Sequence, residues 1–325
     1  MYLLINNKLY YKEEYKMKIV EQNTSYINPK DYDYDYKKFI EFIGRTCYKS
    51  EDKITDESSN EFIKNLLKRK HYAMIEHWIV YIKAKINSVT LDYVNKLRIK
   101  LAQNKFCNFY GENDTIYISA NLRSILERYD YHDTNEDLID FAINNISANY
   151  KFNHIEILTR DEFISEIVRH HKALITDLIY HTFKFTTDRG VTHELVRHRE
   201  ASFAQESTRY CNYSNGKFGS ELTFIKPCFW EEDSDRYNLW KTQCILDEKI
   251  YLDLINNHNA TPQEARTILP NSTKADIIIT ANETEWQHII NLRYHGTTGS
   301  PHPQMKELMD LAYPIIIEES DGRIK

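Results

Sequence analysis

A cationic segment in the second half of the chain contains the residues best suited to chemistry. Arg197, His198 and Arg199 are consecutive, Ser207 follows after seven residues, and Arg209 lies two positions further on. Arginine binds phosphate and carboxylate groups through paired, charge-assisted hydrogen bonds, and a serine hydroxyl adds a neutral donor. The segment therefore indicates a site for a small anion such as a phosphorylated metabolite. The alternative interpretation is a solvated basic turn whose arginines pair with neighbouring carboxylates.

Metal chemistry is the first competing hypothesis for this segment. His193 and His198 are five positions apart, one more than the two histidines of the HExxH zinc motif. On a helix, side chains five positions apart point about 140° away from each other, whereas those four apart differ by about 40°. We therefore expect no metal ion here, and a hydrolase that uses zinc on His193 and His198 is a disfavoured alternative.

Covalent catalysis by a protein side chain is the second competing hypothesis. Ser207 is not part of a GxSxG elbow, and no neighbouring base is evident. Cys211 would become nucleophilic if nearby arginines lowered its pKa, but a lone cysteine is usually a packing residue. We expect both residues to act in binding or packing.

Composition excludes several other classes of function. The chain has 325 residues, a formal net charge of −6, 8 glycines and 5 cysteines. Its acidic balance argues against general binding of nucleic acid, and no glycine-rich phosphate loop is present. The odd, scattered cysteines do not suggest a disulfide framework. No apolar stretch is long enough to cross a membrane, and the first residues do not resemble a secretory signal, so we expect a cytosolic protein.

The hydrophobic pattern predicts one domain over residues 1–325, with helices and strands around the cationic segment. Helices are expected at 59–70, 122–129, 161–180, 191–197 and 235–256, and strands at 78–86, 115–119 and 183–185. Asp188 is placed to cap the helix before the cationic segment, and Thr261 and Asn282 are placed to cap later helices. A last helix should start near Pro303. The stretch 91–101 is basic and amphipathic, and residues from about 87 to 181 have the character of an insertion.

The segment from Arg197 to Tyr210 resembles the RHR-x7-S signature of the flavin-dependent thymidylate synthases. Further elements of that family are matched in the same order along the chain. They are Gly44-Arg45-Thr46-Cys47-Tyr48, the H-x4-EH element from His71 to His77, Ala265-Arg266-x-x-Leu269-Pro270, Thr280-Ala281-Asn282, Asn291-Leu292-Arg293 and His302-Pro303-Gln304. The resemblance covers about two-thirds of the chain, on both sides of the apparent insertion.

The resemblance implies an α/β fold, with helices packed on a central mixed sheet, and a homotetramer whose active sites lie at subunit interfaces. It also implies bound FAD and the reductive methylation of dUMP to dTMP, with 5,10-methylenetetrahydrofolate as carbon donor and NADPH as reductant of the flavin. The flavin carries the hydride, so no covalent protein nucleophile is needed. A non-catalytic protein that binds dUMP at a retained anion site is the alternative, and no nucleic acid or membrane partner is expected.

The resemblance also assigns individual residues. For dUMP they are Glu194, Arg197, Gln205, Ser207, Arg209, Arg266 and Arg293, of which Arg197, Ser207, Arg209 and Arg293 are the expected catalytic residues. For FAD they are Cys47, His71, Glu76, Arg197, His198, Arg199, Asn282, His288 and His302. Three positions depart from forms common in the family: Ala204-Gln205 stands for an Asn-Glu pair, and Ala73 and His288 stand for a Thr and an Asn found in some relatives.

Overall fold

The computed structural model combines helices with antiparallel sheets, which confirms the predicted α/β class. It describes residues 3–5, 8–10, 17–86, 92, 96, 106–127, 137–150, 152–169, 175–216 and 219–325. The helices are α1 Tyr36–Tyr48, α2 Ser58–Lys68, α4 Leu122–Leu126, α5 Leu138–Tyr150, α6 Arg160–Ile167, α7 Arg189–Leu195, α8 Asp235–His258, α9 Pro262–Ala265, α10 Glu283–Arg293 and α11 Pro303–Glu319. The strands are β1 Leu3–Ile5, β2 Lys8–Tyr10, β3 Lys18–Val20, β4 Asn23–Tyr26, β5 Ile79–Lys85, β6 Cys107–Glu112, β7 Thr115–Asn121, β8 His154–Leu158, β9 Tyr180–Asp188, β10 Ser202–Gln205, β11 Thr223–Ile225 and β12 Lys274–Asn282.

The central sheet has the strand order β10-β12-β9-β4 and carries the cationic segment at its edge. Its pairings are all antiparallel, so the expectation of a mixed sheet is wrong in this detail. Strands β9 and β10 both run opposite to β12, which lies between them. The one parallel pairing among the described strands joins β3 to β11 in a separate two-stranded sheet.

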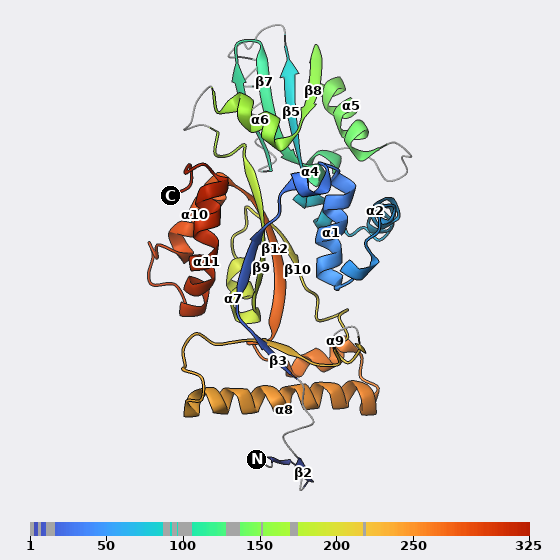
Figure 1. The fold of residues 1–325 in the computed structure, drawn as a ribbon. Coiled ribbons are helices and arrows are strands. Elements are labelled where there is room, and N and C mark those ends of the chain that lie inside the picture. Colours follow the sequence, from blue (N-terminus) through green and yellow to red (C-terminus); the bar gives the residue numbers. More distant parts are fainter. Residues whose placement is uncertain are drawn as a thin grey trace.

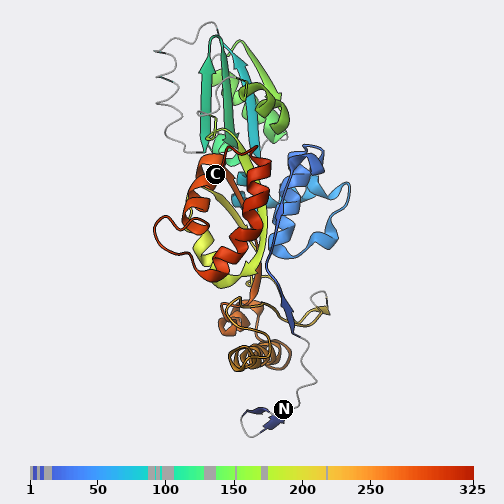
Figure 2. The ribbon, with the colours of Figure 1, turned by 60° about the vertical axis from the view of Figure 1, so that its left-hand side comes forward.

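Helices cover both faces of the central sheet (Figure 1). Ile277 and Ile279 of β12 pack in one core with Trp286 of α10 and Leu308 of α11. Ile278 lies in the core of the opposite face, together with residues of α1. Successive side chains of a strand point to opposite faces, so a strand covered on both faces needs an uninterrupted apolar run. This requirement explains the run of apolar residues in β12. Figure 2 shows α10 and α11 on one side of the sheet and α1 on the other.

A second antiparallel sheet, with the order β6-β7-β5-β8, lies at one end of the central sheet (Figure 1). Ile82 and Ile118 face a core shared with α2, α4 and α5, and Tyr81 and Tyr117 face a core that includes Phe163 of α6. Strands β6, β7 and β8 fall within residues 87–181. The interpretation of this segment as an insertion relative to compact family members stays a prediction.

Most of the predicted elements occur close to their expected ends. The predicted helices at 59–70 and 235–256 are α2 and α8, and the predicted strands at 78–86 and 115–119 are β5 and β7. The predicted caps are also present: Asp188 and Asn282 each accept a backbone hydrogen bond at the start of the next helix, and Thr261 forms a capping box with Glu264.

The helix predicted at 161–180 is wrong in its second half. Helix α6 ends at Ile167, and Tyr180 begins β9, where it pairs with Asn282 of β12. Leu178 and Ile179 are buried in the core that contains Phe163 of α6. Their apolar character, which favoured a helix in the sequence, is therefore explained by their burial outside a helix. Of the predicted helix only Tyr180 belongs to β9, and residues 176–178 form a turn before it. His170 and His171, and the stretch 91–101 apart from residues 92 and 96, lie outside the described residues.

No helix in the described part of the chain is long and apolar enough to cross a membrane.

Candidate functional site

A strand, a capped helix and a short turn place the cationic segment. Strand β9 ends at Asp188, whose carboxylate accepts a hydrogen bond of 2.7 Å from the Val191 amide and starts α7. Burial raises the pKa of Asp188 above its usual value. Helix α7 ends at Leu195, so Arg197 lies in the turn that follows, and β10 begins at Ser202. The segment is thereby held between the end of a helix and an edge strand.

Arg293 joins three segments that are distant in the sequence. Its Nη1 donates to Oε2 of Glu194 at 2.7 Å and its Nη2 donates to the Glu194 carbonyl oxygen at 3.3 Å. Its Nε donates to Nε2 of His198 at 3.2 Å. Arg293 is the last residue of α10, where a cation is favoured by the helix dipole. A guanidinium has five N–H donors, so these contacts leave two for a ligand.

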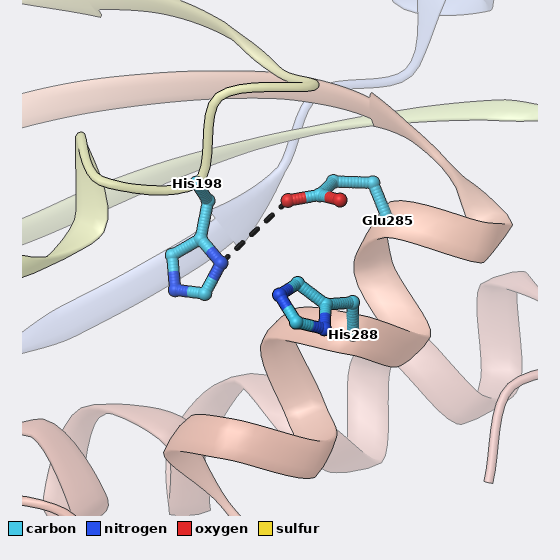
Figure 3. A group of neighbouring side chains, drawn as sticks. All are labelled: His198, Glu285 and His288. Carbon is cyan, nitrogen blue, oxygen red and sulfur yellow. Dashed lines mark ion pairs between the residues drawn. The ribbon is translucent and has the colours of Figure 1, made fainter.

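His198, Glu285 and His288 form a second group beside this arginine (Figure 3). His198 is buried, its Nδ1 lies 3.6 Å from Oε1 of Glu285, and its ring centroid is 5.6 Å from that of His288. Asn282 holds the start of α10 by accepting a hydrogen bond from the Glu285 amide at 2.9 Å. Glu285 and His288 are three positions apart on α10, so they share one face of this helix.

The hydrogen bonds of His198 argue against a metal ion between these three side chains. A guanidinium only donates, so Nε2 of His198 accepts from Arg293 and the ring proton lies on Nδ1, which faces Glu285. In this tautomer His198 has no free lone pair for a metal. His193, the other histidine of the zinc alternative, is exposed on α7 and is not in this group.

Ser207 is positioned through the backbone. Its amide donates to the Cys47 carbonyl oxygen at 3.0 Å, and its Oγ accepts from the Arg209 amide at 3.4 Å. Within the described part of the chain, this hydroxyl has neither an imidazole nor a carboxylate as hydrogen-bond partner. Burial raises the pKa of both Cys47 and Cys211 to about 12, so these thiols stay protonated. The arrangement supports roles in binding or packing for these residues.

A buried carboxylate anchors the segment before Ser207. Glu206 accepts hydrogen bonds from Tyr213 Oη at 2.8 Å and from Lys274 Nζ at 2.9 Å. Its amide donates to the Asp276 carbonyl oxygen at 2.7 Å, and Lys49 lies beside both Glu206 and Asp276. The C-terminal end of α1, β10 and β12 are thus joined next to Ser207. Gln205 points elsewhere, since its Nε2 donates to Thr192 Oγ1 at 2.8 Å.

A cavity of 840 Å³ opens between α1 and α2, beside Tyr210. Oη of Tyr48 and Nδ1 of His71 are 2.9 Å apart, and the rings of Tyr48 and Tyr210 meet edge to face at 5.7 Å. Arg69 and Lys53 also line the cavity, and among the described residues neither forms a salt bridge. Aromatic walls and unpaired cations suit a flat ligand that carries negative charge.

The remaining predicted residues lie apart from the contacts of Arg293 and from the group of His198, Glu285 and His288. Glu76 forms an ion pair with Arg123 of α4. Arg197 and Arg266 are exposed, and Nε of Arg209 donates to Gln263 of α9 at 3.2 Å. Arg199 is exposed in the turn before β10, and the ring of His302 contacts Phe229 at 5.4 Å. The structure therefore groups Glu194, His198, His288 and Arg293, and does not bring all the predicted residues into one pocket of this chain.

The sequence analysis assigns no role to two charged residues that lie beside predicted ones. Glu285 lies beside His198, and its spacing from His288 indicates a shared helix face. Arg123, which pairs with Glu76, carried no signal because 47 positions separate the two residues.

Comparison with known proteins gives these groups a context. The family model described as "Thymidylate synthase complementing protein" matches residues 129–319, which are more than half of the chain. This chain belongs to the thymidylate synthase complementing protein family. The resemblance to flavin-dependent thymidylate synthases is thereby confirmed at the level of the family. The matched region of this family member begins inside the segment 87–181, so it includes the later part of that segment.

Individual relatives match this family member over part of their length. The flavin-dependent thymidylate synthase of Pyrococcus furiosus is 36% identical over 115 residues, which are 34% of this chain and 46% of that protein. That of Corynebacterium diphtheriae is 27% identical over 173 residues, which are 49% of this chain and 66% of that protein. The chain spans about half the length of the curated relatives it matches first. Among solved structures, the UMP/dUMP methylase PolB from Streptomyces cacaoi bound with 5-Br UMP is 20% identical, with 51% of this chain and 84% of that chain covered and a TM-score of 0.37.

Proposed function

We propose that this protein is a flavin-dependent thymidylate synthase, which converts dUMP to dTMP with 5,10-methylenetetrahydrofolate as carbon donor and NADPH-reduced FAD as hydride source. The observation that carries the proposal is the contact of Arg293 with both Glu194 and His198. Arg293, at the end of α10, belongs to a different sequence element from Glu194 of α7 and His198 of the turn after it. Relatives that carry the name of this enzyme support the same reaction.

The proposed dUMP residues supply the donors that a nucleotide monophosphate requires. Arg293 keeps two N–H donors, and Arg197, Arg209 and Arg266 are exposed. Arginines around the uracil also stabilise the negative charge that the ring gains during reaction. Glu194 orients Arg293, and Ser207 and Gln205 offer neutral groups. We infer that Arg197, Ser207, Arg209 and Arg293 are the catalytic residues that touch the substrate.

The residues proposed for FAD fit a flat cofactor in part. His288 is exposed and lies with its ring near His198, and His71 is exposed beside Tyr48. Arg197 and Arg199 are exposed in the cationic segment, whereas Asn282 already caps α10 and Glu76 pairs with Arg123. Cys47 is buried and the ring of His302 contacts Phe229, so we propose that these two residues form part of the wall of the FAD site. When bound, FAD supplies the hydride.

The cavity beside Tyr210 supports a place for the folate co-substrate. Its volume of 840 Å³ and its aromatic side chains suit a ring system, and Arg69 and Lys53 suit carboxylates. The chain does not bring all the proposed dUMP and FAD residues into one pocket, so we also propose a homotetramer in which neighbouring subunits complete each site. Residues 1–325 then form one catalytic domain in the cytoplasm, with 87–181 as an insertion.

The test is the visible absorption spectrum of the purified protein under anaerobic conditions. We expect a flavin band that bleaches with NADPH and returns when dUMP and methylenetetrahydrofolate are added, with formation of dTMP. A protein that binds dUMP but never reoxidises the reduced flavin would instead be the non-catalytic nucleotide-binding alternative. A colourless protein that does not take up added FAD would refute the flavin proposal.

A further inference from the structure

A second cavity, which we call the junction cavity, lies where the central sheet meets the second sheet. Its volume is 160 Å³, and its lining includes Tyr26 of β4, Phe39 of α1, Trp78, Leu158 of β8 and Arg160 of α6. None of the residues proposed for dUMP or FAD lines it. The junction cavity is therefore distinct from the proposed dUMP and FAD residues, although His77, which lines it, directly follows Glu76.

The walls of the junction cavity are aromatic and fixed by packing. The rings of Phe39 and Trp78 meet edge to face at 5.5 Å, and the ring of Tyr26 packs on Phe183 at 5.2 Å. Phe39 and Phe183 are fully buried in the cores on opposite faces of the central sheet. An apolar cavity of about 150 Å³ in a protein core accepts a benzene molecule. The junction cavity thus has the size and walls for a single six-membered aromatic ring.

Two polar atoms of the lining, Oη of Tyr26 and Nε2 of His77, are buried without a hydrogen-bond partner among the described residues. Oη of Tyr26 is shielded from solvent and makes no hydrogen bond within the described part of the chain. A buried hydroxyl without a partner costs free energy, so the site favours a ligand that supplies an acceptor. Tyr34, which also lines the cavity, differs because its Oη donates to Asp161 at 2.7 Å.

Arg160 adds a buried positive charge. It is 7% exposed, its Nε donates to the Tyr180 carbonyl oxygen at 3.1 Å, and its Nη2 donates to Nδ1 of His181 at 3.1 Å. Its carboxylate neighbour is Asp161, at 3.5 Å and half exposed. Three of the five guanidinium donors are thus used.

The nearest buried carboxylate is not available to this arginine. Glu283 accepts hydrogen bonds from Arg323 at 2.8 to 3.1 Å, and it lies 2.9 Å from Nε2 of His181. The carboxylates that act on Arg160 are Asp161, at 3.5 Å, and the half-buried Glu319, whose pKa is raised by burial and lowered by the guanidinium. Two guanidinium N–H donors of Arg160 remain for the carboxylate of a ligand.

We propose that the junction cavity binds a small aromatic carboxylate, with its ring between the aromatic walls and its carboxylate accepting hydrogen bonds from Arg160 and Tyr26. Benzoate is the simplest molecule of this class. The ring accounts for the apolar walls, and the carboxylate accounts for the unpaired Tyr26 hydroxyl and the two remaining donors of the Arg160 guanidinium. A neutral ring or a carboxylate without a ring satisfies only half of these features.

The test is titration calorimetry of the full chain with benzoate, benzamide and acetate. We expect benzoate to bind one site per chain, benzamide to bind at least tenfold more weakly because it lacks the charge, and acetate to give no measurable binding. Tyr26→Phe should weaken benzoate about tenfold through the loss of one hydrogen bond, and the matched Tyr34→Phe should leave it unchanged.

Each contrary result has a distinct meaning. No binding of benzoate, or a crystal soaked in benzoate whose junction cavity holds only water, would overturn the proposal. If benzamide bound as tightly as benzoate, Arg160 would have no role in recognising the charge. If acetate bound as tightly as benzoate, the aromatic walls would have no role. Either result would also overturn the proposal. If Tyr26→Phe does not fold, the comparison of the three ligands with the unmodified protein still decides.

Discussion

Replacement of Arg293 by lysine tests how much its guanidinium group contributes to the binding of dUMP. Lysine keeps the charge, but it cannot make the three contacts with Glu194 and His198 while offering further donors to a ligand. Two guanidinium N–H groups are left for dUMP, and each hydrogen bond to an anion contributes about 1 to 1.5 kcal/mol at a partly exposed site. We therefore expect Arg293→Lys to weaken dUMP binding by about 2 kcal/mol, or about 30-fold.

The assay is equilibrium binding of dUMP to the FAD-loaded protein, measured by titration calorimetry without methylenetetrahydrofolate. Arg236→Lys is the matched control, because Arg236 is exposed on α8. It should bind dUMP as the unmodified protein does. An Arg293→Lys variant of unchanged stability that binds dUMP within threefold of the unmodified protein would refute this role for the guanidinium.

Three further predictions concern the framework of the site. Burial alone would raise the pKa of Asp276, but Lys274, Lys49 and Lys184 outweigh it and hold the pKa below its usual value. The stability that this carboxylate contributes is present at neutral pH and is lost as the pH falls below about 4. In the Asp276→Asn variant, the unfolding free energy measured with urea should therefore fall less steeply below this pH, and an unchanged slope would contradict this. Burial lowers the pKa of His181 to about 4, so the unfolded chain binds this proton first and stability should fall as the pH drops from about 6.5. His181→Asn should make the slope between pH 6.5 and 5 shallower, and an equal slope would show that His181 does not titrate in this way. Asn282→Ala should cost about 1 kcal/mol of unfolding free energy through loss of the α10 cap, whereas Asn257→Ala on the exposed face of α8 should cost less than half of that; equal costs would argue against the cap.

Local signals predicted the elements that hold the site. Asp188 and Asn282 were recognisable as caps because an N-cap depends on a side chain and the amide three positions later. The apolar run of β12 needed burial on both faces. These features depend on neighbours in the sequence, so α7 and the start of α10 were predictable, whereas the strand β12 was not among the predicted elements.

Features that depend on distant contacts were not predictable. The local periodicity indicated neither the end of α6 at Ile167 nor the start of β9 at Tyr180, which pairs with β12 about a hundred residues further on. The approach of Arg293 to His198 and the opening of the junction cavity arise from packing between elements. The family signature named candidate residues, but only the fold shows that Glu285 lies beside His198.

The most direct test of the proposed function is transfer of isotope from methylene-labelled methylenetetrahydrofolate to dUMP. The purified, FAD-loaded protein should form labelled dTMP only when NADPH and dUMP are both present, and Arg293→Lys should reduce this yield strongly at low dUMP concentration. Binding of FAD and dUMP without labelled dTMP, under conditions in which the flavin is fully reduced, would contradict the assignment of this chain as a thymidylate synthase.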